Sequence, residues 1–350
     1  MSKSSVGLDI GFSSIKAVAL SISDNPPKLL SLGMIGSPQP GLSSDGDLDL
    51  EAVAVAIKKL FQAARIEYKE VVAALPESKV FTRVIDDLPY LSDSELSPAI
   101  RYASEEFIPL PVSEVNLNWQ VLSRAKGERG PGINKSGRTV VFVVASPKNI
   151  INKYLKVLEM AGVKVRALET EIIASTRALV GNNPFSPTTL IVQMGTTTTD
   201  FAVVSKGLIL LTRSISTGGL ALTRAIAGHF NFEMMQAEEY KKVYGILPDQ
   251  LEGQVYQALK PVTDVMVEEA RRVTQAFQTK NPQNQIKRVV LSGGGAKLPG
   301  LVQYLASNLG LEVQEADPWY FLAKESNVKV KLAKDASLYS VAVGLALRED

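Results

Sequence analysis

The chain has 350 residues, which is enough for two lobes of ordinary size. Charged residues make up 21% of the chain and its net charge is +2, so we expect no nucleic-acid partner, and the absence of cysteine excludes disulfides and thiolate metal sites. The sequence contains no run of about 18 apolar residues, the length that a membrane-spanning helix needs. We therefore expect a cytoplasmic protein that reaches a membrane only through a partner.

The first motif, VGLDIGFSSIKAVAL at residues 6–20, predicts a strand, a tight polar turn and a second strand. Asp9 lies inside the first apolar run, where an unpaired carboxylate is costly to bury. A metal ion or a phosphate-bound cation would pair with it, and neighbouring amides are the alternative partners. Gly11, Ser13 and Ser14 supply a close backbone approach and hydroxyl donors, which suit an anion.

The next segments alternate between helix and strand patterns, which indicates an α/β fold. Apolar residues at helical spacing predict a helix over Asp49–Ile66 with Asp49 as its N-cap. The run EVVAAL at residues 70–75 predicts a buried strand. Ser92 and Glu95 form a capping-box pattern and therefore predict a helix start.

Two strand patterns follow, VNLNWQVL and TVVFVVA, and a segment rich in glycine and basic residues joins them. We expect this segment to be a mobile hairpin loop. Ser146 and Pro147 then open a predicted helix that ends at Gly162. Further helical patterns cover Leu220–Phe230, Glu233–Tyr244 and Asp249–Thr279, the last divided near Pro261.

A second motif, LIVQMGTTTTDFAVV at residues 190–204, aligns with the first, so that Gly195 matches Gly11. Each copy has a strand, a glycine, a hydroxyl-rich turn and another strand. The repeat predicts two lobes of similar design, each with a turn that fits a phosphate group. Taken singly, each turn is weak evidence, because ordinary hairpins also use glycine, serine and threonine.

A third motif, VVLSGGGAKLPGL, runs from a predicted strand through Gly293, Gly294 and Gly295 to a helix beginning near Leu301. Three glycines would leave bare backbone against which a flat ligand such as a purine could pack. The alternative interpretation is a flexible joint between strand and helix.

Together, in this order, the three motifs resemble the two phosphate motifs and the adenosine motif of the actin-like ATPase superfamily. The resemblance implies two ribonuclease-H-like lobes around a nucleotide cleft. It implies a first lobe at 1–186 with an inserted subdomain at about 77–160, a second lobe at 187–330 with a helical subdomain at about 218–285, and a return to the first lobe at 331–350.

Two longer stretches are similar to the PilM family of type IV pilus assembly proteins. One is LPYLSDSELSPAIRYASEEFIPLPVSEVNLNWQVL, and the other is STGGLALTRAIAGHFNFEMMQAEEYKK. This resemblance implies an ATP-binding adaptor that holds the N-terminal cytoplasmic peptide of a PilN-like inner-membrane protein in a groove beside the inserted subdomain. Contacts with other pilus assembly proteins and an oligomer are compatible with it.

The resemblance also implies roles for individual residues. Asp9 would organise Mg²⁺, and Glu171 would orient the water that attacks the nucleotide. The residues implied to bind ATP are Gly11, Ser13, Ser14, Lys16, Gly195, Thr196, Thr197, Thr198, Gly218, Gly219, Glu238, Lys241, Gly293, Gly294, Gly295 and Leu298.

Some of these residues have simpler interpretations. Lys16 could point to solvent, because strand side chains alternate between faces. Glu171 could be an exposed acid favoured at a helix start. Glu238 and Lys241 could form only a surface ion pair, since they are three residues apart on a predicted helix.

One departure from the superfamily pattern concerns hydrolysis. FtsA-type relatives have an acid in place of Gln193 and glycines in place of Thr196 and Thr197. The missing acid would remove a metal-organising or water-activating charge, so we expect nucleotide binding with weak or absent hydrolysis. A small-molecule kinase of the same superfamily and an FtsA-like filament-forming protein are the alternative functions.

Overall fold

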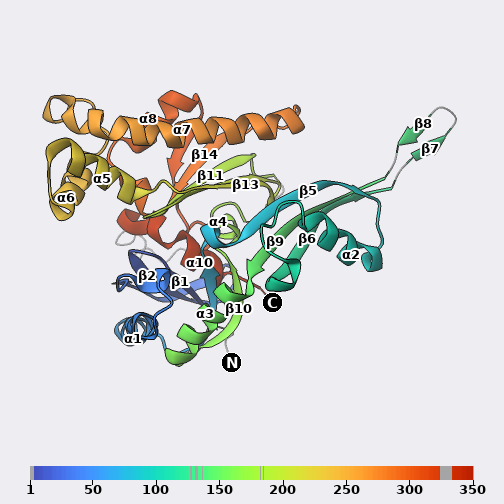
Figure 1. Ribbon diagram of the computed structural model, residues 1–350, viewed down its shortest axis with the longest axis horizontal. Helices are drawn as coiled ribbons and strands as arrows, with labels where there is room; N and C mark the ends of the chain where they lie inside the picture. Colours follow the sequence, from blue (N-terminus) through green and yellow to red (C-terminus); the bar gives the residue numbers. More distant parts are fainter. Residues whose placement is uncertain are drawn as a thin grey trace.

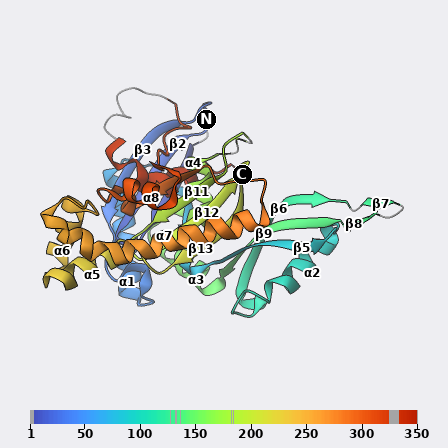
Figure 2. The same ribbon diagram turned by 90° about the horizontal axis from the view of Figure 1, so that it is seen from above.

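The computed structural model describes residues 4–126, 128–130, 133–135, 137–181, 183, 185–323 and 333–349. Two five-stranded sheets form its centre, and a smaller sheet extends from one side (Figures 1 and 2). Among the residues described, no helix combines the length and apolar character that crossing a membrane requires.

The first sheet has the strand order β10-β4-β1-β2-β3. Strands β1, β4 and β10 are parallel, whereas β2 and β3 join as antiparallel neighbours. Its strands are β1 (Ser4–Ile10), β2 (Ser14–Ser21), β3 (Lys28–Gly36), β4 (Glu70–Leu75) and β10 (Lys164–Thr170).

The second sheet has the order β13-β12-β11-β14-β15, with the same sequence of parallel and antiparallel pairs. The match confirms the internal repeat at the level of topology. Its strands are β11 (Thr189–Met194), β12 (Thr199–Ser205), β13 (Leu208–Ile215), β14 (Arg288–Ser292) and β15 (Glu312–Glu315).

Helices cover both faces of the first sheet. The helices α1 (Asp47–Ala63) and α3 (Lys148–Met160) pack on one face. The other face meets α4 (Glu171–Leu179) and α10 (Ser340–Ala346). The fit of α10 against β1 is close, because a Cβ atom added to Gly7 would lie 2.6 Å from the backbone nitrogen of Ala346.

The second sheet carries a larger helical layer on one face, and α4 approaches its other face, between the two sheets (Figure 1). Its helices are α5 (Gly219–Phe230), α6 (Met234–Tyr244), α7 (Gln254–Lys280) and α8 (Leu301–Leu309). The predicted division near Pro261 is wrong, because α7 continues through it. The apolar face of α7, which includes Val255, Leu259 and Met266, is buried in the core and offsets the roughly 3 kcal/mol that an interior proline costs.

The smaller sheet is inserted between β4 and β10 and has the order β5-β9-β6. It consists of β5 (Phe81–Pro89), β6 (Val115–Ala125) and β9 (Arg138–Pro147), with α2 (Asp93–Ser104) against one face. Phe142 on its other face packs with Ile172 of α4 and Ile191 of β11. The inserted sheet therefore packs against α4, which lies between the two larger sheets, and against β11 of the second sheet.

Between β6 and β9, a short hairpin of β7 (Glu128–Gly130) and β8 (Ile133–Lys135) projects from the inserted sheet (Figure 1). The loop predicted here therefore includes a two-stranded segment, and residues 127, 131, 132 and 136 lie outside the described residues.

The two predicted helix starts have different outcomes. The capping box of Ser92 and Glu95 is confirmed. Helix α1 begins at Asp47, so Asp49 lies in its first turn and is not the N-cap. The lobe boundaries stay predictions.

Candidate functional site

The two repeated motifs form turns with the same hydrogen bond. In the first turn, the N–H of Gly11 donates to the carbonyl of Ser14 at 3.1 Å, and in the second the N–H of Gly195 donates to the carbonyl of Thr198 at 2.9 Å. The alignment made from the sequence therefore holds atom for atom at the turn.

The tips of these two turns meet between the sheets. The Oγ atom of Ser13 lies 2.6 Å from the Oγ1 atom of Thr196, a hydrogen bond between turns that connect strands of different sheets. Behind the second tip, Gly219 and Leu220 donate their N–H groups to the carbonyls of Gly195 and Thr196. The start of α5 is thus fixed against the second turn, and all these groups gather at one place.

The buried acid of the first motif has a lysine partner. Asp9 and Lys16 are opposite each other in the β1–β2 register, and Lys16 Nζ donates to Asp9 Oδ2 at 3.0 Å. Both side chains are less than a tenth exposed, so the solvent-facing interpretation of Lys16 is wrong. The pair follows from the hairpin, because residues in register on antiparallel strands share one face. The expected role of Asp9 toward Mg²⁺ stays a prediction.

The second motif carries a different pair at the matching positions. Gln193 lies opposite Asp200 in the β11–β12 register. The side chain of Gln193 accepts a hydrogen bond from Ser175 of α4, and Asp200 Oδ1 accepts one from Ser214 Oγ at 2.5 Å. Burial raises the pKa of Asp200 to about 6. Among the described residues, the acid of the first motif is therefore paired with a lysine, whereas the acid of the second motif has no basic hydrogen-bond partner.

Two more acids follow parallel strands of the first sheet. Glu77 comes two residues after β4 ends, and Glu171 comes directly after β10. Asp9 lies near the end of β1, which is parallel to both strands through β4. Carboxyl ends of parallel strands meet at one edge, which is where ligands of α/β sheets commonly bind. Sequence analysis missed Glu77, although its position after the apolar run EVVAAL was a usable signal.

The electrostatics confirm that these acids are close together. Burial, together with the negative charges of Asp9, Asp200 and Glu77, raises the pKa of Glu171 well above its usual value. The interpretation of Glu171 as a simple exposed helix-start acid is therefore wrong. Among the described residues, no group of three or more acidic or histidine side chains is arranged to hold a metal ion by itself.

Glu238 and Lys241 connect α6 to the start of α5. Lys241 Nζ donates to Glu238 at 2.5 Å, to Thr223 Oγ1 at 2.9 Å and to the carbonyl of Gly219 at 3.1 Å. Gly219 also donates its N–H group to the second turn, so this network links α6 to that turn. Glu238 and Lys241 therefore form more than a surface ion pair. Its expected place beside ribose and adenine stays a prediction.

The three glycines of the third motif have different surroundings. Gly293 has a φ of +81°, and a Cβ atom there would lie 2.5 Å from the carbonyl oxygen of Met194. A Cβ atom on Gly295 would overlap the Met194 side chain, so both glycines are needed for packing. Gly294 alone is exposed and has room for a side chain. Leu298 is buried in the core of the second sheet and its helices.

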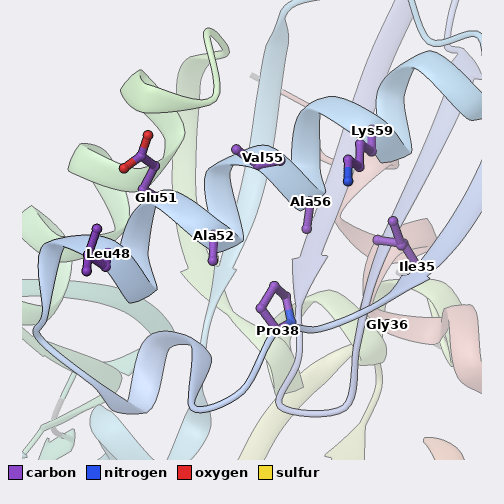
Figure 3. A pocket seen from close by; sticks show the side chains of 9 residues that line it. All are labelled: Ile35, Gly36, Pro38, Leu48, Glu51, Ala52, Val55, Ala56 and Lys59. Atoms are coloured by element: carbon purple, nitrogen blue, oxygen red, sulfur yellow. The ribbon is translucent and has the colours of Figure 1, made fainter.

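A surface groove lies elsewhere, between α1 and the end of β3 (Figure 3). It is lined by Ile35, Gly36, Pro38, Leu48, Glu51, Ala52, Val55, Ala56 and Lys59. None of these residues belongs to the inserted sheet or to the predicted nucleotide site. The partner groove expected beside the inserted subdomain therefore stays a prediction.

Two sheets of identical topology, two matching turns that touch at their tips and a triple-glycine corner define the class of the molecule: it has the actin-like ATPase fold. Within that class the chain belongs to the family of the type IV pilus assembly protein PilM, whose model matches residues 7–350.

Solved structures support this assignment. A chain of the PilM-PilN type IV pilus biogenesis complex is 29% identical over 99% of both chains, with a TM-score of 0.82. MreB5 of Spiroplasma citri, solved with AMPPNP, shares the fold at a TM-score of 0.53 and 14% identity, over 98% of this chain and 95% of its own. Among curated proteins, the cell division protein FtsA of Enterococcus hirae is 24% identical over 88% of this chain and 77% of its own length.

Proposed function

We propose that this protein is a nucleotide-binding adaptor of type IV pilus assembly. It binds the N-terminal cytoplasmic segment of a PilN-like inner-membrane protein and is held at the membrane through that partner. The observation that carries the proposal is the 29% identity, over 99% of both chains, to a protein solved as the PilM-PilN complex.

The proposed ligand of the cleft is ATP with Mg²⁺. Hydroxyl groups of Ser13 and Thr196 meet at the turn tips, where a phosphate group could accept hydrogen bonds from both motifs. The acids behind the tips suit a cation. Because those acids do not form a metal site alone, Mg²⁺ would need phosphate oxygens and water to complete its ligands, which is its usual mode of binding.

We further propose that the protein hydrolyses ATP slowly. Gln193 occupies the position at which FtsA-type relatives have an acid, and its amide is engaged with Ser175 of α4. A neutral amide brings no negative charge to a metal ion and does not accept a proton from water. The nucleotide would therefore act by holding the lobes in one arrangement, which requires different affinities for open and closed forms.

Calorimetry tests the adaptor function. The intact protein is titrated with a peptide from the N-terminus of the PilN-like protein of the same organism, with and without Mg·ATP, and with a scrambled peptide as control. We expect saturable binding of the native peptide only. Equal heats for the native and scrambled peptides in both conditions would reject the proposal.

Nucleotide binding has a separate test at the third motif. The substitution Gly294→Val adds a side chain where, of the described residues, only Leu338 lies within 4 Å, at 3.5 Å, so the fold should tolerate it. We expect it to weaken Mg·ATP binding by at least about tenfold, since it obstructs the backbone surface proposed for the purine. Gly228→Val is the matched control, because no described atom lies within 4 Å of an added Cβ there and the residue is near the C-terminal end of α5, away from the turns. Equal affinities for the two variants would contradict the assignment.

A further inference from the structure

The inserted sheet has an edge strand, β6, with one side open to pairing. Strand β6 pairs with β9 on one side, and no strand of the described residues pairs with its other side. Figure 2 shows β6 at the outer margin of the inserted sheet, with β9 between it and β5. The backbone N–H and C=O groups that point away from β9 can therefore bind another strand.

The two edges of the inserted sheet differ in how they are protected. Strand β5 carries charged residues and a proline, by which natural edge strands avoid pairing, and Thr82 connects it to Thr212 of β13 at 2.8 Å. The edge segment of β6, Val115–Val121, contains no charged residue, proline or glycine. Beyond it, a β-bulge between Val121 and Ser123 interrupts the pairing with β9. The edge segment is thus a short, regular strand without protection against pairing.

The side chains of the edge segment alternate between apolar and polar. Trp119 is in register with Val143 of β9, so both side chains lie on the face that carries α2. Helix α2 does not cover the margin of this face, because Trp119 remains 36% and Val121 38% exposed. The other face of the edge segment carries exposed amide side chains, those of Asn116, Asn118 and Gln120. An exposed tryptophan beside an exposed valine on an open edge is typical of an interface.

The alternation makes the edge segment complementary to itself. In an antiparallel pair of two β6 strands with a two-fold axis at Asn118, Leu117 of one copy lies opposite Trp119 of the other. Val115 then lies opposite Val121, so apolar residues meet only apolar residues on the face of α2. The opposite face pairs amides only: Asn118 with Asn118 and Asn116 with Gln120. Aromatic and β-branched cross-strand pairs stabilise a sheet, and each pair occurs twice in a two-fold interface.

We propose that β6 joins two copies of this chain into a dimer with one continuous sheet across the inserted sheets. The charges beside the edge segment favour this antiparallel arrangement. It brings the acidic start of one strand, at Glu114, toward the basic end of the other, at Arg124 and Lys126. The inference goes beyond the proposed adaptor function and does not depend on a nucleotide.

Sedimentation velocity of the intact protein tests the self-association. Because the edge segment is short, we expect a weak dimer with a Kd on the order of 10 μM. Val121→Lys places a charge on the pairing face twice in each dimer and should weaken association at least about tenfold. Val55→Lys is the matched control, because Val55 is 41% exposed and lies on α1, which packs on the first sheet. It should associate as the wild type does.

Cysteine cross-linking tests the register, since the chain has no cysteine of its own. Asn118→Cys places two thiols opposite each other, within the reach of a disulfide. In Gln120→Cys the two thiols would be offset by about 13 Å along the strands, which is too far. Under the same mild oxidation, Asn118→Cys should form covalent dimers at least about tenfold faster than Gln120→Cys.

Three results would overturn the inference and leave the adaptor function intact. One is a wild type that stays monomeric up to about 100 μM, tenfold above the expected Kd. Another is equal cross-linking of the two cysteine variants. The third is a Val121→Lys variant that associates like the wild type but no longer binds the PilN-like peptide, because the edge would then serve that partner instead of a second copy.

Discussion

The crossing of α4 and α10 provides a direct test of the packing between the two sheets. A Cβ atom added to Gly344 of α10 would overlap the carbonyl group of Ala174 of α4 and would lie 3.0 Å from its Cα atom. Both residues are buried, and Arg177 donates to the carbonyl of Gly344 at 2.6 Å. The substitution Gly344→Ala should therefore force the two helices apart.

The expected destabilisation follows from two opposed effects. Overpacking of a core typically costs about 1–3 kcal/mol, and the obstacle here is backbone that cannot rotate away, so we take the upper value. Replacing glycine by alanine inside a helix favours the folded state by about 1 kcal/mol. The net expectation is that Gly344→Ala lowers the free energy of unfolding by about 2 kcal/mol.

Urea unfolding followed by circular dichroism measures this difference. Gly228→Ala is the matched control, because Gly228 lies in α5 and is exposed, and no atom of the described residues lies within 4 Å of an added Cβ. The control should gain up to about 1 kcal/mol from helix propensity alone. A gain for Gly344→Ala equal to that of the control would show that the helices do not pack as described.

Three other substitutions test buried charges. Burial raises the pKa of Glu77 to about 8, so the stability that its protonated form contributes is complete below pH 4.5 and is lost as the pH rises through about 8. Between pH 5 and 9, the free energy of unfolding of Glu77→Gln, measured with urea, should therefore rise relative to that of the wild type, by at most about 5 kcal/mol. Asp9→Asn leaves Lys16 buried and should cost about 3–5 kcal/mol, seen as a lower melting temperature that Lys16→Met partly restores. Glu169→Gln removes the buried charge that Arg177 contacts through two hydrogen bonds. It should lower the urea midpoint more than Asp86→Asn, which removes only an exposed ion pair with Lys280.

Much of the fold could be predicted because its strands and repeats have local signals. The run EVVAAL corresponds residue for residue to β4, and the alignment of Gly11 with Gly195 anticipates two sheets of one topology. The error at Pro261 has a different origin. Proline breaks isolated helices, but the burial of one face of α7 depends on tertiary packing that a local pattern does not contain.

The candidate site could be predicted only where its residues lie on the motifs themselves. The pairing of Asp9 with Lys16 could have been derived, since a turn closed between Gly11 and Ser14 fixes which residues are opposite. The hydrogen bond between Thr82 of β5 and Thr212 of β13 could not have been derived, because the insertion of a whole subdomain brings these two residues together. No spacing in the sequence specifies that contact.

The close fit of α10 on β1 has a consequence for the order of folding during synthesis. The strand that contains Gly7 is synthesised well before the helix that covers it, which comprises residues 340–346. At about 5–20 residues per second, translation takes roughly 20 to 70 s to span this interval. During that time the side of β1 that α10 covers is without its native cover, so a chaperone or the nascent chain itself must shield it until elongation reaches α10.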